Sequence, residues 1–193
     1  MAAAATGRVV LIDAADATSS GAPGDSNAIV AELLRQGCQR TVLAPIVDAA
    51  AVDQASAAGV GATITVDVGG SLDPRYTPLR VTGVVRVLSD GRMRSESHGE
   101  AWYAGRSAVV QCGPATLVLT SRPVSLYDRT LFLANGQDPA AFDMTVVKSP
   151  LSQRRFFEEG AQKLINVDAP GATSANLQSL GHTRCARPLW PLD

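Results

Sequence analysis

Residues 8–27, RVVLIDAADATSSGAPGDSN, are the stretch that decides how the rest of the chain folds. The apolar, β-branched run at 8–14 is typical of a strand buried on both faces, and the small residues at 15–24 predict a long loop after it. Residues 25–27, Asp-Ser-Asn, are favourable N-cap residues, so a helix should begin directly after them. The stretch therefore predicts a strand, a loop and a helix in succession.

The next residues continue this alternation. Apolar residues at helical spacing run to Gly37, which is predicted to end the first helix in a left-handed conformation. The segment 41–46, TVLAPI, reads as a second strand, and Asp48 is predicted to cap a helix that ends at Gly59. Because strands joined through a helix are connected by right-handed crossovers, the first strands should lie parallel with helices over the sheet.

The middle third changes to a period of two, which is typical of antiparallel hairpins. Apolar and polar residues alternate in four segments separated by glycine-containing turns, namely 62–68, 79–88, 107–112 and 116–120. The alternation of helices and strands then returns in four more segments, which are a helix at 131–133 capped by Asp128, a strand at 142–147, a helix at 153–162 and a strand at 164–167. The tail at 187–193 is predicted to pack as an extended strap, because its two prolines exclude a helix.

The predicted fold class is therefore α/β, with a mainly parallel sheet, flanking helices and an antiparallel β-hairpin insertion in the middle third. We expect one domain over residues 1–193, because no linker divides the chain, and we expect disorder at 1–7. With 193 residues and 46% hydrophobic side chains, the chain can bury a sizeable core without disulfides.

Net charge and cysteine content indicate the cellular compartment of the protein and the kinds of partner that it can bind. Lys and Arg number 17 against 18 Asp and Glu, so there is no net charge to attract nucleic acid or an anionic membrane. The three cysteines are scattered and never in CxxC spacing, which favours a reducing compartment. The amino terminus lacks the features of a signal peptide, and no apolar run is long enough to span a membrane. We therefore expect a cytoplasmic protein that binds neither nucleic acid nor membrane.

The loop after the first strand is the first candidate ligand site, because ligands of open α/β folds bind at the carboxyl edge of the sheet. Gly21 and Gly24 would let the backbone approach a ligand, beside Asp16 and Ser20. The residues Asp25 and Ser26 precede the helix, whose N–H groups could hold an anion. The loop matches neither the dinucleotide nor the phosphate-loop pattern, and from spacing alone a long, well-capped loop without a ligand is the simpler explanation.

Two further loops could complete this site. Arg122 follows one predicted strand, and the pair Lys148 and Ser149 follows another. If these strands run parallel to the first, Arg122, Lys148 and the glycine loop would form a positively charged cradle for a carboxylate. The alternative is that the two cations pair at the surface with Asp128 or Asp143, where such pairs stabilise little.

The sequence contains few residues that could form a catalytic metal site or a nucleophile site. Zinc needs about three side-chain ligands, and the chain offers only His98 and His182, far apart in sequence. Asp13, Asp16 and Asp25 could surround a hard cation, although capping by Asp25 and solvent exposure of Asp16 are simpler explanations. No GxSxG motif or adjacent Cys-His pair indicates a nucleophile.

Seven segments, in order along the chain, carry a resemblance to a known family. They are Asp13 to Asn27, Ala44-Pro-Ile-Val-Asp48, Ala58-Gly-Val-Gly-Ala62, Leu119-Thr-Ser-Arg-Pro123, Lys148-Ser149, Asn166-Val-Asp-Ala-Pro-Gly171 and Arg187-Pro-Leu-Trp-Pro-Leu-Asp193. In this order they resemble the carboxy-terminal domain of the microcystinase C family. The resemblance covers nearly the whole chain.

This resemblance implies a zinc metallopeptidase lineage whose named member opens linearised microcystin peptides. In that family the zinc ligands and the catalytic histidine belong to a larger amino-terminal domain, so no residue of this chain inherits a catalytic or metal-binding role and no cofactor is expected in it. Many relatives carry a histidine directly after the Lys-Ser pair, where this chain has Pro150. A site that needs that histidine would be incomplete here.

Two functional hypotheses follow. In the first, the chain is an accessory domain that packs on a zinc-bearing amino-terminal metallopeptidase domain, in the same or a separate chain, and helps to line the cleft for a peptide substrate. This hypothesis predicts an exposed apolar patch where the partner docks. In the second, the chain is a self-sufficient small-ligand or metal-dependent hydrolase that uses the Asp13, Asp16 and Asp25 loop.

Overall fold

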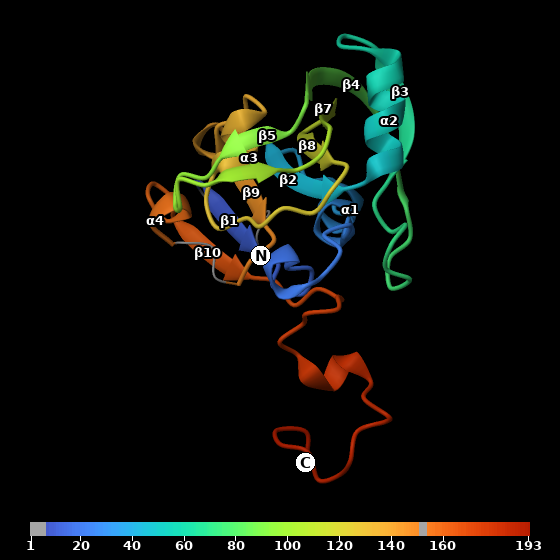
Figure 1. Ribbon diagram of the computed structural model, residues 1–193, viewed down its shortest axis with the longest axis vertical. Helices are drawn as coiled ribbons and strands as arrows, with labels where there is room; N and C mark the ends of the chain where they lie inside the picture. The colour runs from blue at the N-terminus through green and yellow to red at the C-terminus, as the bar shows by residue number, and fades with distance from the viewer. Residues whose placement is uncertain (1–6, 151–153) are drawn as a thin grey trace.

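An eight-stranded sheet forms the centre of the computed structural model, which describes residues 7–150 and 154–193 (Figure 1). In spatial order its strands are β10 (Lys163–Asn166), β1 (Val9–Ile12), β9 (Met144–Val147), β2 (Val42–Val47), β8 (Ala115–Thr120), β7 (Ser107–Cys112), β4 (Leu79–Ser89) and β3 (Thr63–Val68). The strands from β10 to β8 are parallel, and those from β8 to β3 are antiparallel. The predicted fold class is confirmed.

Helices cover both faces of the sheet. On one face lie α1 (Ala28–Arg35) and α2 (Ala49–Ala58), and on the other α3 (Thr130–Ala134) and α4 (Arg154–Phe157). The alternation within β1 explains this arrangement, because Val9 and Leu11 belong to the apolar cluster of α1 and α2, whereas Val10 belongs to the cluster of α3 and α4. The sheet is thus the middle of three layers, with an apolar cluster on each of its faces, and this arrangement requires central strands that are apolar on both faces.

Local chemistry sets the ends of the first helices as the sequence predicts. The carboxylate of Asp48 accepts a 2.9 Å hydrogen bond from the N–H of Ala51, so it caps α2. Gly59 follows α2 with a φ of 85°, and Gly37 lies just beyond α1 with a φ of 67°. Short 3-10 turns complete the helical elements, at η1 (Thr18–Ser20), η2 (Pro139–Ala141) and η3 (Leu177–Leu180).

Two local expectations differ from the structure. A separate two-stranded sheet of β5 (Arg92–Arg94) and β6 (Ala101–Tyr103) was not predicted, because strands of three residues are too short to show a period. The helix predicted at 153–162 ends at Phe157, before Gly160, which has a φ of 72°. Its first predicted residue lies outside the described residues, as do residues 1–6 of the segment expected to be disordered.

The loop at 69–78, between β3 and β4, returns to the carboxyl edge of the parallel strands. The amide of Asn27 donates to the carbonyls of Val68 and Thr77, at 2.8 and 2.9 Å. The hydroxyl of Tyr76 donates to the carbonyl of Pro170, beyond β10, at 2.6 Å. These contacts hold a loop of the antiparallel half at the carboxyl edge of the parallel strands.

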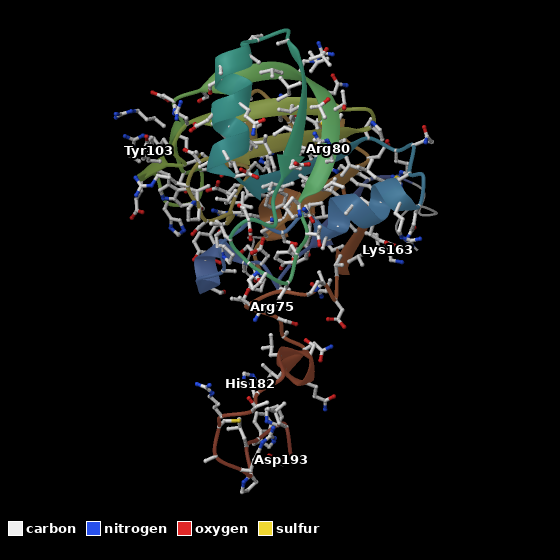
Figure 2. The ribbon with its side chains drawn as sticks, turned by 90° about the vertical axis from the view of Figure 1, so that its right-hand side faces the viewer. Arg75, Arg80, Tyr103, Lys163, His182 and Asp193 are labelled. Atoms are coloured by element: carbon white, nitrogen blue, oxygen red, sulfur yellow. The ribbon has the colours of Figure 1, made fainter. Side chains whose placement is uncertain are left out.

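The tail does not pack on the body as a strap, so that prediction is wrong. Residues 175–193, which we call the carboxy-terminal arm, project away from the carboxyl edge (Figure 1). Figure 2 shows His182 and Asp193 well below the sheet, whereas Arg75, in the loop at 69–78, lies at the end of the body that faces the arm. The side chain of Trp190 in this arm is 87% exposed.

In the described part of the chain, no helix is long and apolar enough to cross a membrane. Cys38 and Cys112 are free and buried, and burial raises the pKa of the Cys112 thiol to about 11. This thiol is therefore protonated and unreactive at neutral pH. The cytoplasmic location stays a prediction.

Candidate functional site at the carboxyl edge

A buried ion pair joins the loop after β1 to the end of β9. The ammonium of Lys148 lies 2.8 Å from Oδ2 of Asp16, and both side chains are almost fully buried. The same carboxylate accepts hydrogen bonds from the N–H of Gly24 at 2.8 Å and of Ser26 at 2.7 Å. Asp16 therefore holds the two ends of the glycine loop together, and we call Asp16, Gly24, Ser26 and Lys148 the lysine knot.

The ammonium of Lys148 has no donor left for a ligand. It donates at 2.8 Å to Asp16, and at 2.7 Å to the carbonyls of both Gly24 and Ser26. An ammonium has three N–H donors, so these three acceptors saturate it. Burying the charge is tolerable because it is paired and fully hydrogen-bonded. Lys148 pairs with Asp16 inside the protein, so the alternative of a surface pair with Asp128 or Asp143 is wrong for this residue.

The other two carboxylates of the loop are also buried. Asp13 accepts from the N–H groups of Ala15 and Asp16, and its desolvation raises its pKa despite the opposing charge of Lys148. Oδ2 of Asp25 accepts from the N–H of Leu72 at 2.7 Å, which ties the loop at 69–78 to the site. Two expectations are therefore wrong. Asp16 is buried instead of exposed to solvent, and the side chain of Asp25 does not cap α1.

One buried oxygen in this region stands apart. Oδ1 of Asp25 has no hydrogen-bond partner among the described residues, although the residue is fully buried. A buried carboxylate oxygen without a donor is destabilising, and a water molecule or a small donor would relieve the cost. Oδ1 of Asp25 is thus a fully buried acceptor that the described residues leave unused.

The predicted site residues fall into two groups. The structure brings together Asp16, Gly24, Asp25, Ser26, Lys148 and Ser149, all of which are buried. Ser20 and Gly21 lie exposed at the tip of the loop instead. Arg122 lies over the ring of Tyr103, 5.6 Å from its centroid, so it does not form a cradle with Lys148. Ligand binding by these residues stays a prediction.

A surface hollow of about 540 Å³ lies beside the knot, at the ends of β1, β9 and β10. It is lined by Ala14, Ala15, Pro150, Asn166, Val167, Asp168, Ser174, Ala175 and Asn176. The hollow is open, and its lining mixes main-chain, amide and carboxylate groups with small apolar ones. Its position matches the crevice in which open α/β folds bind ligands.

The donor set does not fit a hydrolytic zinc ion. The described residues contain no group of three His, Cys, Asp or Glu side chains placed to hold a metal. His98 packs against Tyr127, with ring centroids 5.8 Å apart, whereas His182 belongs to the arm. Oδ1 of Asp13 and both oxygens of Asp16 already accept main-chain N–H groups, so these three oxygens are engaged in holding the loop.

Sequence reasoning missed three contributors to this edge. Asn27 and Tyr76 join it through the main-chain hydrogen bonds described above, and burial raises the pKa of Tyr76 well above its usual range. Asp48 was expected only as a cap, but its second oxygen accepts from the N–H of Gly69 at 2.9 Å. These contacts join segments far apart in sequence, so no local spacing could have indicated them.

Comparison with known proteins gives consistent results. A family model described as MlrC C-terminus matches residues 11–184. The curated protein Microcystinase C of Sphingomonas sp is 28% identical over 187 residues, which cover 96% of this chain and 36% of that protein. A crystal structure from Mesorhizobium sp. BNC1, described as "Putative metallopeptidase", has a TM-score of 0.87 and 29% identity, and the match covers 100% of this chain and 39% of that one. The chain therefore spans little more than a third of each relative.

Proposed function

This chain belongs to the MlrC C-terminus family, and from that premise we propose that it is the non-catalytic carboxy-terminal domain of a microcystinase C-like metallopeptidase. It would pack on an amino-terminal domain that carries the zinc ion, in the same or a separate polypeptide. Its carboxyl edge would form one wall of the cleft that binds a peptide. Cleavage itself would be performed by the amino-terminal domain.

The saturation of the lysine knot is the observation that carries this proposal. A catalytic lysine or aspartate needs a free donor or acceptor directed at the substrate. Here Lys148 makes three hydrogen bonds, and both oxygens of Asp16 accept main-chain N–H groups. These residues hold a glycine loop in one shape, which suits a rigid wall for a substrate better than the machinery of hydrolysis.

The open hollow beside the knot supports a role in lining a cleft. Peptides bind along surfaces that offer main-chain partners and small side chains, and Asn166 and Asn176 border this hollow with amide groups. Most of each relative's length lies outside the match, which leaves ample chain to form the other wall. Pockets between domains are common positions for binding sites.

The test compares three samples in a peptidase assay on a linear peptide, which are this chain, the unmatched amino-terminal region of the Sphingomonas protein, and their mixture. We expect hydrolysis only where the amino-terminal region is present, with faster turnover or a lower KM in the mixture. Thermal unfolding of the chain confirms that it is folded. Equal kinetics with and without this chain, and no complex in size-exclusion chromatography, would contradict the proposal.

A second candidate function rests on Oδ1 of Asp25, the buried carboxylate oxygen without a donor. If the chain were a metal-dependent hydrolase, this oxygen would be available to a cation or a water molecule. Elemental analysis of the purified chain distinguishes the two functions. A stoichiometric metal together with hydrolysis by the chain alone would favour the second function.

A further inference from the structure

The carboxy-terminal arm, residues 175–193, has the composition of a docking element but nothing to dock on within the described chain. Its main apolar side chains are Leu177, Leu189 and Trp190, which are 37%, 37% and 87% exposed. Trp is among the residues that contribute most to binding in protein interfaces. A tryptophan this exposed, with leucine beside it, is unusual on a free surface.

The arm is internally organised, although it leaves the body. Among the described residues, Asn176 makes the last hydrogen bond from the arm to the body, from its amide to the carboxylate of Asp168 at 3.1 Å. Further along, Arg187 makes two 2.8 Å hydrogen bonds to the carboxylate of Asp193, which also accepts from the N–H of Leu189 at 2.7 Å. These bonds close a loop that presents Trp190 outward. Ordering a chain segment costs conformational entropy. Because these hydrogen bonds already order the loop in the free chain, less conformational entropy is lost when it binds.

The similarity to the Mesorhizobium structure indicates what the arm contacts. That match covers the whole of this chain, the arm included, but only 39% of the longer chain. A counterpart of the arm therefore exists in a protein that has a large additional region. The arm also leaves from the carboxyl edge, the side on which our proposed function places the partner domain (Figure 1).

We propose that the arm is the clamp that holds the amino-terminal metallopeptidase domain, with Trp190 and Leu189 inserted into an apolar pocket of that domain. The inference rests on the proposed function and adds the residues that make the contact. A second copy of this chain is the competing occupant of the arm, and the experiment below separates the two.

The experiment uses Trp190 as its own reporter. Replacing Trp102→Phe leaves Trp190 as the single tryptophan of a chain that has two. In the isolated chain we expect emission typical of exposed indole and quenching by acrylamide close to that of free tryptophan. On adding the unmatched amino-terminal region of the Sphingomonas relative, and after subtracting the emission of that region measured alone, we expect a blue shift, a quenching constant reduced several-fold and a 1:1 complex.

Matched variants locate the contact. Trp190→Ala, made with Trp102 intact, should weaken binding at least about tenfold, because a buried anchor of this type is commonly worth that much. Val60→Ser is the control, since Val60 is 63% exposed and belongs to the turn between α2 and β3. Figure 1 shows this turn at the opposite end of the body from the arm. The control should bind as tightly as the parent chain, and neither variant should change the melting temperature of the isolated chain.

Each outcome has a definite meaning. A complex in which Trp190 stays fully quenchable and Trp190→Ala binds normally would overturn the clamp but leave the proposed domain packing intact. The absence of any complex would count against the proposed function itself, and with it the clamp. Protection of Trp190 in the isolated chain, together with a doubled mass in sedimentation, would assign the arm to a second copy and overturn the inference.

Discussion

The lysine knot and the carboxy-terminal arm lie at the same edge of the molecule and differ in how completely their groups are satisfied. In the knot, the ammonium of Lys148 has three acceptors within 2.8 Å, and the residue is 2% exposed. In the arm, the indole of Trp190 is 87% exposed. The hydrogen bonds of the knot are thus complete within this chain, whereas we propose that the apolar side chains of the arm are covered by a partner domain. Both segments resemble the same family, so resemblance alone does not separate the two roles.

The largest effect we expect comes from removing the cation of the knot. Lys148→Met should destabilise the chain by about 3–5 kcal/mol, because it leaves the carboxylate of Asp16 buried without its counter-charge. Urea denaturation measures the change. Lys163→Met on β10, where the lysine is exposed, is the control and should change the free energy of unfolding by less than about 0.5 kcal/mol. An unchanged or raised stability of Lys148→Met would contradict the structural role that we assign to this ion pair.

A pair of glycines tests the shape of the loop that the knot holds. A Cβ at Gly24 would lie 2.6 Å from Thr18 and 2.7 Å from Val47, at a φ of 81°, whereas one at Gly21 would meet nothing within 4 Å, at a φ of 93°. Gly24→Ala should therefore cost about 3 kcal/mol, from strain and overpacking together. Gly21→Ala should cost only about 1 kcal/mol, from backbone strain. Equal costs in denaturation would contradict the packing of the loop.

The carboxylate of Asp128, just before α3, should give a smaller effect on stability that depends on pH. Burial disfavours the charged form of Asp128, but hydrogen bonds from Thr130, Ser95 and Ser97 outweigh it and lower its pKa to about 2. Since the folded pKa lies below the unfolded value of about 3.9, the stabilisation is present above about pH 4 and is lost as the pH falls toward 2.

Asp128→Asn should consequently cost about 2 kcal/mol at neutral pH, because it weakens hydrogen bonds to a charged acceptor. The difference in stability between the variant and the parent chain should shrink as the pH is lowered from about 4 to about 2. Chemical denaturation across this range measures it. A difference that does not vary with pH would mean that the Asp128 side chain is not ionised in the folded protein.

The smallest expected effect is on the stability of the isolated chain without its arm. Ending the chain at Ser174 should change the free energy of unfolding of the body by less than about 0.5 kcal/mol, because the arm buries little against it. Urea denaturation measures this change. A large loss of stability would mean that the arm packs on the body in solution.

Much of the fold follows from local patterns. The cap at Asp48, the glycine stop at Gly59 and the hairpin periods all depend on neighbouring residues, and each of them predicts an element that the structure contains. The short β5 and β6 pair was missed because three residues carry no period. The early end of α4 was missed because Gly160 was not taken as a stop.

The candidate site was less predictable, because its contacts are not local. The partner of Lys148 is Asp16, 132 residues away, and the sheet order β1-β9-β2 brings the two together. Similarly, Arg122 was expected beside Lys148 but lies over Tyr103 of β6, a strand that the sequence did not reveal. The residues at the sheet edge could be named from sequence, but the pairing among them depends on the tertiary structure.

Hydrogen–deuterium exchange of this chain, alone and with the amino-terminal region of the Sphingomonas relative, tests the account most directly. We expect the amides of Gly24 and Ser26 in the knot to exchange slowly in both samples. The amides of the arm should exchange rapidly in the chain alone and become protected in the complex. Protection of the arm in the chain alone, or a knot that becomes protected only with the partner, would contradict the account.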